Sequence, residues 1–239
     1  MEVVNYLLGY KDLKIVQDTE MFNFSLDSVL LPNFVTLNKK NSKILDIGCG
    51  NAPVSLILST KTNAEIIGVE IQKKVYDLAI KTVKLNNLEK QIKIINEDIN
   101  NLYNDLESDT FDTIVCNPPY FKIDDESNLN ISEYKTIARH EIKLNIEQIM
   151  NIAKKLLKNN GNIAIVHRPN RLIDVIETMK KNNIEPKRMQ LVYPKLDKEA
   201  NILLIEGVKN GKPGLKILPP LYSHNEKDEY TDQIKKYFQ

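Results

Sequence analysis

Four consecutive residues, Asn117-Pro118-Pro119-Tyr120, combine groups that are unusual at the end of a strand. They follow residues 111–116, an apolar and β-branched run that is typical of a buried strand. The two prolines remove two successive backbone N–H groups and hold Asn117 away from helical geometry. The segment is therefore predicted to be a stiff loop that presents an amide oxygen, the Pro118 carbonyl and an aromatic face to one flat ligand. We expect that ligand to carry an amine or amide nitrogen.

A glycine turn earlier in the chain predicts a second ligand-binding loop. A short apolar strand ends in Asp46, Gly48 and Gly50 follow in G-x-G spacing, and Pro53 suits the first turn of a helix. Glycines at such a turn let a ligand approach the backbone, and the helix N-terminus offers free N–H groups. Pro53 occupies the place of the third glycine of a dinucleotide fingerprint, and a phosphate is disfavoured beside Asp46. A ligand with a cationic or amino group fits this loop better.

Two further predicted strands lead into acidic side chains. Residues 64–70 form a strand that ends in Glu70, about twenty residues after the glycine turn, where an acid can accept both hydroxyls of a ribose. Residues 91–96 form the next strand, and Asp98 follows it, where it can accept an adenine amino group. Each acid alone is equally well explained as a helix cap or a solvated loop residue. Together with Asp46 and Asn117 they predict a nucleoside site.

The order of the elements explains how these residues come together. Strands alternate with helices, which implies an α/β fold with a parallel sheet and helices on both faces. Ligands bind beyond the carboxyl ends of the strands in such sheets. Two late extended runs lack a long intervening helix and are predicted to pair antiparallel. The predicted helices are 72–87, 144–157 (closed near Gly161) and 171–182, the fifth strand is 162–166, and the late pair is 188–193 with 201–208.

The segments outside this alternation are less regular. Residues 13–17 are predicted to form a short strand, and Ser25 or Asp27 is expected to cap a helix that contains Pro32 near its first turns. An amphipathic helix explains the apolar residues there but leaves the polar cluster Ser25, Asp27 and Ser28 without a role. Residues 121–140 form a long polar connection, and such loops are usually functional or disordered.

Composition narrows the class of protein. The chain has 239 residues, 42% of them hydrophobic and 27% charged, which suits one larger globular domain or one domain with a small appendage. We find no apolar run of membrane-spanning length and no signal-peptide pattern at the start, so a cytoplasmic protein is expected. Cys49 and Cys116 are expected to be free thiols in a reducing compartment, and the three histidines lack metal-ligand spacing. The formal net charge is +1, but residues 161–219 carry eleven Lys and Arg against six Asp and Glu, a weak indication of a polyanionic partner.

With these residues assembled, the sequence resembles the class I S-adenosylmethionine-dependent methyltransferases. Asp46 to Gly50 looks like their glycine-rich cofactor motif, Glu70 and Asp98 match their ribose and adenine acids, and residues 117–120 match the N-P-P-[YF] motif of the branch that methylates amino groups. The resemblance implies a Rossmann-like, seven-stranded methyltransferase domain over 1–239. In it, residues 1–40 cover the cofactor site, 41–219 form the catalytic core and 220–239 form a tail.

Three more segments are similar to the bacterial tRNA1(Val) (adenine(37)-N6)-methyltransferase family. They are Phe24–Leu31, Ala138–Glu141 and Val166–Pro169. The resemblance implies transfer of a methyl group from S-adenosylmethionine to adenine N6 in the tRNA anticodon loop, with S-adenosylhomocysteine as product and no metal or obligate protein partner. The implied catalytic residues are Asn117, Pro118, Pro119 and Tyr120, and the implied cofactor-binding residues are Ser25, Asp27, Asp46, Gly48, Cys49, Gly50, Glu70, Ile71, Asp98, Ile99 and Asn117. The implied substrate-binding residues are Tyr120, Arg139, His140, His167 and Arg168.

The residues alone do not distinguish adenine from other substrates that carry an amine or amide nitrogen. A methyltransferase acting on glutamine N5 of a release factor uses the same amide logic, but such proteins usually carry an additional N-terminal helical domain, for which residues 1–42 are too few. A guanine N2 methyltransferase of rRNA usually has a duplicated domain, which does not fit in this length. A catalytically silent RNA chaperone is disfavoured by the intact set of Asp46, Glu70, Asp98 and residues 117–120.

Overall fold

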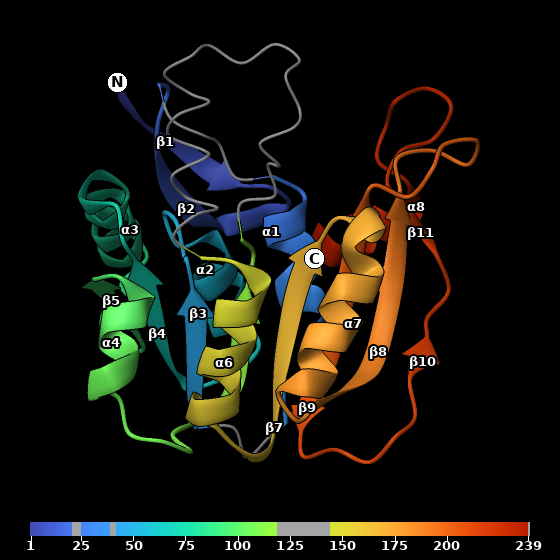
Figure 1. Ribbon diagram of the computed structural model, residues 1–239. Coiled ribbons are helices and arrows are strands. Elements are labelled where there is room, and N and C mark those ends of the chain that lie inside the picture. Colours follow the sequence, from blue (N-terminus) through green and yellow to red (C-terminus); the bar gives the residue numbers. More distant parts are fainter. Residues whose placement is uncertain (21–24, 39–41, 119–143, 239) are drawn as a thin grey trace.

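A mixed nine-stranded sheet runs through the molecule in the computed structural model, which describes residues 1–20, 25–38, 42–118 and 144–238 (Figure 1). The strand order is β10-β8-β9-β7-β6-β3-β4-β5, and β11 pairs with β8 off this path. The long strands are β3 (Lys43–Ile47), β4 (Glu65–Glu70), β5 (Ile92–Asn96), β6 (Phe111–Cys116), β7 (Leu157–His167), β8 (Ile184–Tyr193) and β9 (Ile202–Lys209). The short ones are β10 (Lys216–Ile217) and β11 (Leu221–Tyr222).

Strand direction confirms the predicted sheet. Parallel pairing joins β5, β4, β3, β6 and β7, while β9 runs antiparallel to both β7 and β8. The central strands β3 and β6 are almost wholly buried, as expected for apolar runs covered on both faces. The expected seven strands are therefore present, and β10 and β11 add two that the sequence pattern did not reveal.

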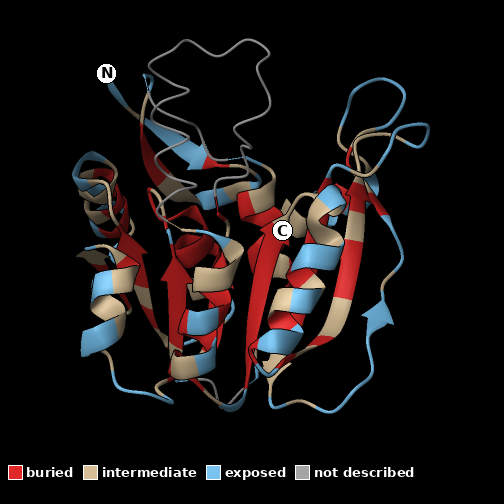
Figure 2. Ribbon diagram, viewed as in Figure 1, coloured by how far each residue is buried: buried red, intermediate tan, exposed pale blue. Residues whose placement is uncertain are grey.

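Helices cover both faces of the sheet (Figures 1 and 2). The first core cluster contains residues of α1, α2 and α3, and the second contains residues of α4, α6 and α7. The helices are α1 (Asp27–Phe34), α2 (Pro53–Ser59), α3 (Lys73–Leu85), α4 (Ile99–Asp105), α6 (Ile146–Leu156), α7 (Leu172–Lys181) and α8 (Asp232–Lys235), with short 3₁₀ turns η1 (Pro169–Arg171) and η2 (Lys236–Phe238). In Figure 2 the central strands of the large sheet are largely buried, whereas the helices are exposed on their outer sides.

Three local predictions need correction. Helix α1 begins at Asp27 with Leu26 at the N-cap and no side-chain cap, so neither Ser25 nor Asp27 caps it. Pro32 lies near the end of α1 rather than in its first turns. Only Asn33 and Phe34 of the helix follow it, so its missing N–H interrupts little of the helix. Gly161 lies inside β7 instead of closing α6, because Leu157 already ends that helix in an extended conformation.

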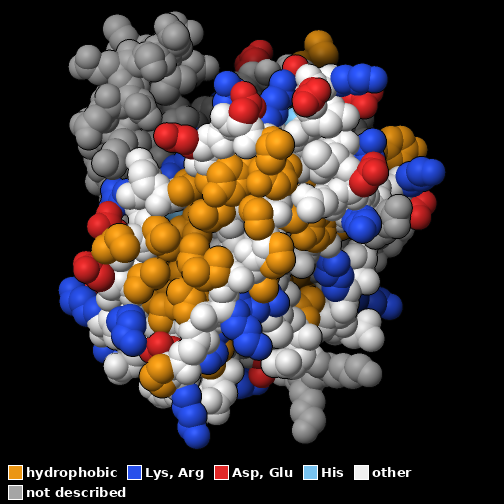
Figure 3. Space-filling model, turned by 90° about the vertical axis from the view of Figure 1, so that its right-hand side faces the viewer, with side chains coloured by type: hydrophobic (Ala, Val, Ile, Leu, Met, Phe, Trp, Pro, Cys, Tyr) orange, Lys and Arg blue, Asp and Glu red, His pale blue; other side chains and the backbone are white. Residues whose placement is uncertain are grey.

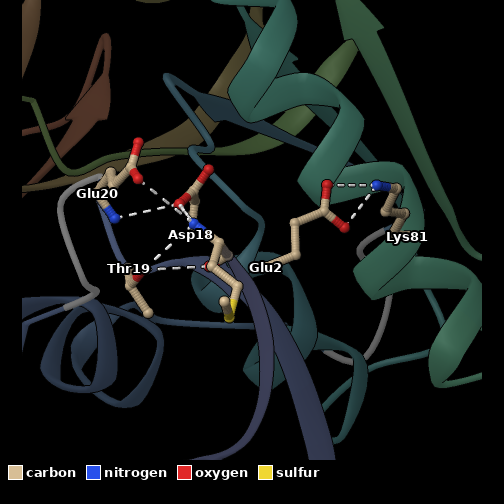
Figure 4. A network of polar contacts seen from close by, with 6 residues as sticks. Glu2, Asp18, Thr19, Glu20 and Lys81 are labelled. Carbon is tan, nitrogen blue, oxygen red and sulfur yellow. Dashed lines mark hydrogen bonds and ion pairs between the residues drawn. The ribbon is translucent and has the colours of Figure 1, made fainter.

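The N-terminal residues form a hairpin of β1 (Glu2–Leu7) and β2 (Tyr10–Asp18) that packs against α3. Helix side chains satisfy the backbone of β2: Val16 donates to Thr82 Oγ1 at 3.0 Å and Lys14 to Asn86 Oδ1 at 2.9 Å. The Lys81 ammonium contacts both oxygens of Glu2, at 2.5 and 2.6 Å, and the Met1 amino group lies 2.7 Å from Asp18 (Figure 4). The short strand predicted at 13–17 is thus part of a longer one whose edge is covered by α3.

The C-terminal residues pack on the face of the sheet that also carries α1 and the N-terminal hairpin. Ile234 of α8 is fully buried in the first core cluster, and Phe238 packs on Gly9 in the hairpin turn. Strands β10 and β11 pair in parallel with β8 and cover part of its edge. Ile217 of β10 remains 73% exposed, and Figure 3 shows hydrophobic side chains gathered on this side of the molecule.

A buried polar network joins the end of α1 to the sheet away from the strand carboxyl ends. The Glu206 carboxylate accepts hydrogen bonds from the Thr36 N–H at 2.6 Å and from its hydroxyl at 2.7 Å, and Asn162 Nδ2 donates to it at 3.1 Å. Arg188 lies beside the same carboxylate, with Nε 3.4 Å from Glu206 Oε1. Because unpaired buried polar groups are costly, this network holds Thr36, and with it the end of α1, in one position against the sheet.

Candidate active site

The glycine turn between β3 and α2 is shaped by left-handed backbone. Gly48 has φ +66° and Gly50 φ +59°, and a Cβ added at either would meet nothing within 4 Å. Such a backbone is open to a ligand at both positions. Cys49, between them, is buried, and its N–H donates to the Val69 carbonyl at 3.1 Å, which ties the turn to β4.

Asp46 lies on β3 immediately below this turn and is only 1% exposed. Its Oδ2 accepts a hydrogen bond from the Ser55 hydroxyl of α2 at 2.7 Å. Burial raises the pKa of Asp46 to about 7, because desolvation outweighs the hydrogen bond from Ser55. A cationic ligand at the turn would favour the ionised carboxylate, so the chemistry of this residue suits the amino-bearing ligand expected from the sequence.

Glu70 ends β4 and bridges the two loops around it. Its Oε2 accepts from the Gly50 N–H at 3.1 Å and its Oε1 from the Gln72 N–H at 2.8 Å. Desolvation raises the pKa of Glu70, although these backbone donors oppose the shift. A carboxylate has about four acceptor positions, so it can hold the glycine turn and still accept hydroxyl groups of a ligand.

The residues after β4 and β5 are held by local contacts. Asn96 Nδ2 donates to the Glu70 carbonyl at 2.8 Å and to the Ile71 carbonyl at 3.2 Å. Asp98 caps α4, accepting from Asn100 N–H and Nδ2, both at 2.9 Å. Ile99 is buried in the second core cluster, so only its backbone can reach a ligand at the rim. Asp98 therefore has a structural task as well as the predicted ligand-binding one.

Asn117 follows β6, the strand that pairs with β3 in register Cys116 to Ile47. Its Nδ2 donates to the Ser28 hydroxyl of α1 at 3.2 Å, and the following Pro118 is buried. The loop after β6 and the glycine turn after β3 thus emerge side by side. Pro119, Tyr120, Arg139 and His140 lie outside the described residues.

The start of α1 meets the end of β7 through opposite charges. Asp27 is largely desolvated, which raises its pKa, while the positive charge of Arg168 and a hydrogen bond from Ser25 act in the opposite direction. Arg168 Nη1 also donates to the Asn201 carbonyl at 3.1 Å. The two segments that resembled one family in the sequence, around Asp27 and around Arg168, are therefore neighbours in space.

His167 lies at the end of β7, and its Nδ1 accepts from the Arg168 N–H at 2.9 Å. Burial and the nearby Arg171 charge lower the pKa of His167 to about 4. The imidazole is therefore neutral near pH 7, and it can act there as a hydrogen-bonding group but not as a cation.

Sequence reasoning missed two hydroxyl groups of this site, Ser28 and Ser55. Ser28 belonged to the polar cluster left without a role, which was a usable signal. Ser55 gave none, because a serine in the first turn of a helix is ordinary. Among the described residues there is no group of three or more His, Cys, Asp or Glu arranged to hold a metal ion, and no helix long and apolar enough to cross a membrane.

Comparison with known proteins identifies the family. A model described as a methyltransferase domain matches residues 38–230. The chain belongs to this methyltransferase domain family. A protein of Bacteroides fragilis strain YCH46 named tRNA1(Val) (adenine(37)-N6)-methyltransferase is 26% identical over 231 residues, 96% of each chain.

Solved structures agree on the fold. A structure described as a predicted O-methyltransferase from Agrobacterium tumefaciens has a TM-score of 0.70 at 17% identity, covering 89% of this chain and 95% of that one. A geranyl diphosphate C-methyltransferase from Streptomyces coelicolor, solved with Mg²⁺, geranyl diphosphate and S-adenosyl-L-homocysteine, has a TM-score of 0.56 at 9% identity, covering 76% of each chain. The chain is a methyltransferase with the predicted Rossmann-like fold.

Proposed function

We propose that this methyltransferase methylates the exocyclic N6 amine of an adenine in tRNA, at position 37 of the anticodon loop of tRNA1(Val), the substrate named for its relatives. The observation that carries the proposal is the pairing of β6 with β3, which sets Asn117 beside the glycine turn. Asn117, which can hold a nitrogen, and the glycine turn, which fits the methyl donor, then lie at the same edge of the sheet. The adenine and the tRNA come from the names of the relatives.

The residues around the glycine turn fit S-adenosylmethionine, which when bound supplies a methyl group made electrophilic by its sulfonium. We assign the open backbone at Gly48 and Gly50, with the Asp46 carboxylate beneath it, to the amino-acid end of the donor. The Glu70 carboxylate would accept the ribose hydroxyls, and Asp98 the adenine amino group. Cys49, Ile71 and Ile99 would contribute backbone contacts, and Ser25 and Asp27 would close the site from α1.

Asn117 would prepare the nitrogen of the substrate. An exocyclic amine is a weak nucleophile because its lone pair is delocalised into the ring. Two acceptors, the Asn117 amide oxygen and the Pro118 carbonyl, can each take one N–H of that amine and favour its tetrahedral form. Positive charge develops on the nitrogen as the new bond forms, so acceptors aimed there stabilise the transition state. Holding the nitrogen in line with the methyl group supplies much of the remaining rate.

The RNA must present its base outside the stack to reach this pocket. We assign Tyr120 to stacking on the base, with the range of about 1–3 kcal/mol found for single-stranded bases. Arg168 and Arg139 would contact loop phosphates, and His140 and the neutral His167 would offer hydrogen bonds to phosphates or neighbouring bases. Phosphate contacts of this kind make binding weaken as salt increases.

The direct test is transfer of label from S-adenosylmethionine to separate pools of tRNA, rRNA, DNA and release factor. Label in tRNA, recovered as N6-methyladenosine after digestion to nucleosides, is the expected result. Label only in protein would instead identify a glutamine methyltransferase, and label only in rRNA guanine a guanine N2 methyltransferase. Either result, or label only in DNA, would overturn the proposal.

Replacing the amide tests the role of Asn117. Asn117→Ala should abolish methyl transfer while cofactor affinity, measured by calorimetry, stays within about twofold, because the lost amide holds the amine and the donor keeps its contacts with the other cofactor-binding residues. Asn159→Ala, which removes an exposed amide from the opposite end of β7, is the matched control and should keep full activity. Full activity of Asn117→Ala would contradict the mechanism.

A further inference from the structure

The orientation of the Asn117 amide is not set by an ordinary Asx-turn. Asparagine side chains are commonly fixed by the backbone N–H two residues later, in an Asx-turn. Here both following residues, Pro118 and Pro119, are prolines and have no N–H to donate. The same prolines that make the loop stiff therefore remove the donor of an Asx-turn, and the structure shows a hydrogen bond between the side chain and a group from elsewhere in the fold.

Ser28 supplies that group from 89 positions earlier in the chain. Its hydroxyl oxygen accepts the hydrogen bond from Asn117 Nδ2 at 3.2 Å, and Ser28 is only 5% exposed. The bond is partly shielded from water and is worth more than an exposed one. Because the two heteroatoms of an amide diverge from one carbon, fixing Nδ2 also fixes the direction of Oδ1, the atom that must accept an N–H of the substrate.

Helix α1 places Ser28 firmly. The Ser28 N–H donates to the Ser25 carbonyl at 3.1 Å, and the next two N–H groups donate to Leu26. The adjacent Val29, Leu30 and Leu31 are buried in the first core cluster, so the first turn of α1 cannot rotate without exposing them. The position of the hydroxyl is thus determined by the hydrophobic packing of the helix.

We propose that Ser28 is a positioning residue for methyl transfer, which acts by holding the Asn117 amide so that its oxygen faces the amine. This inference rests on the proposed function only in taking Asn117 as the acceptor of a substrate N–H. It also gives a role to the member of the polar cluster near residue 27 that neither helix formation nor cofactor binding explains.

The test compares Ser28→Ala with two matched variants. Ser28→Ala should lower kcat about tenfold, the effect of losing one partly buried hydrogen bond, without changing cofactor affinity. Ser28→Thr keeps the hydroxyl and should recover most of kcat. Asn33→Ala removes a side-chain hydrogen bond from the same helix, that to Tyr10, and should leave kcat unchanged.

A double-mutant cycle separates positioning from general damage to α1. In an Asn117→Asp background the side chain can no longer donate to Ser28 and can only accept from its hydroxyl, so adding Ser28→Ala should not repeat the tenfold loss of kcat, and the two effects should not add. If Ser28→Ala fails to fold, Ser28→Cys gives the same comparison, since a thiol has nearly the same shape but is a weaker acceptor.

Several results would overturn the inference. These are an unchanged kcat in Ser28→Ala, a loss of kcat that adds fully to that of Asn117→Asp, or a loss confined to cofactor affinity. Failure of the proposed substrate gives a different pattern. If the wild-type protein methylates a glutamine of a release factor or a guanine of rRNA instead of adenine in tRNA, kcat is compared on that substrate. The ratios of variant to wild-type kcat then test the role of Ser28 in the same way.

Discussion

Asp46 shows how strongly one side chain can depend on its surroundings. Its pKa in the folded protein, about 7, lies above the value near 4 of an unfolded chain. The folded state therefore holds the proton more tightly, and the associated stability is complete below about pH 4 and lost as pH rises toward 7. We predict that Asp46→Asn, which can still accept from Ser55, is more stable than the wild type at pH 8 by up to a few kcal/mol.

Thermal unfolding of the ligand-free proteins between pH 4 and pH 8 measures this difference. The gap between Asp46→Asn and the wild type should shrink as pH falls toward 4, because the wild-type carboxyl becomes protonated in both states. Calorimetry with S-adenosylmethionine should show that the variant loses cofactor affinity. The affinity should rise with pH in the wild type and stay low at every pH in Asp46→Asn. Equal affinities would mean that Asp46 serves only the fold.

Much of the site at residue scale followed from the sequence. Asp46, Glu70 and Asn117 stand at or near the ends of strands, and strand ends converge whenever the sheet is parallel. The contact of Ser28 with Asn117 could not be predicted in that way, because it depends on how α1 is rotated against the sheet. The raised pKa of Asp46 was equally hidden, since it follows from burial that exists only in the packed structure.

At the scale of elements, strands β3 and β4 must approach closely for the glycine turn to keep its shape. A Cβ added at Gly68 of β4 would lie 2.8 Å from Cys49 Sγ and 2.8 Å from Ile94 Cδ1. We predict that Gly68→Ala displaces Cys49, costs about 1–3 kcal/mol of stability and weakens cofactor binding. Chemical denaturation and cofactor calorimetry measure the two effects.

Gly207→Ala provides a matched control for this variant. A Cβ there would lie 2.6 Å from Ile184 Cγ2 and 2.9 Å from Met179 Cε, so the overpacking is similar, but Gly207 lies on β9, toward the end of the sheet away from the glycine turn. Gly207→Ala should lose stability and keep the cofactor affinity of the wild type. Equal loss of affinity in both variants would show that stability alone, and not the position of Cys49, controls binding.

The elements that were predicted well share a physical signal. Strands β3, β4 and β6 are short apolar runs that end in turn residues, and such runs have few alternatives in an α/β chain. Helix α4 escaped prediction because residues 99–105 are largely polar and are held as a helix by the Asp98 cap. The hairpin of β1 and β2 has a mixed pattern, since only part of it is buried, and its backbone is completed by α3.

At the scale of the whole molecule, the two ends of the chain meet on one face of the sheet. The hairpin turn at Gly9 contacts Phe238, and the 3₁₀ turn η2 lies against α1, the helix that carries Ser28. The first core cluster contains residues from the N-terminal hairpin, the central sheet and the tail. We infer that residues 1–40 and 220–239 belong to the same cooperative unit as the catalytic core, as one domain over 1–239 requires.

Ile234 tests this unity, because it is fully buried although it lies within the last residues of the chain. Ile234→Ala should lower the free energy of unfolding of the entire protein by about 2–4 kcal/mol, the range for truncating a buried aliphatic side chain. The unfolding should remain a single transition, seen alike by far-UV circular dichroism and by tyrosine fluorescence. Ile217→Ala, at a position 73% exposed, is the control and should change stability by less than about 0.5 kcal/mol. If Ile234→Ala instead leaves the main transition unchanged, or splits off an early phase, the tail folds apart from the core and cannot support α1.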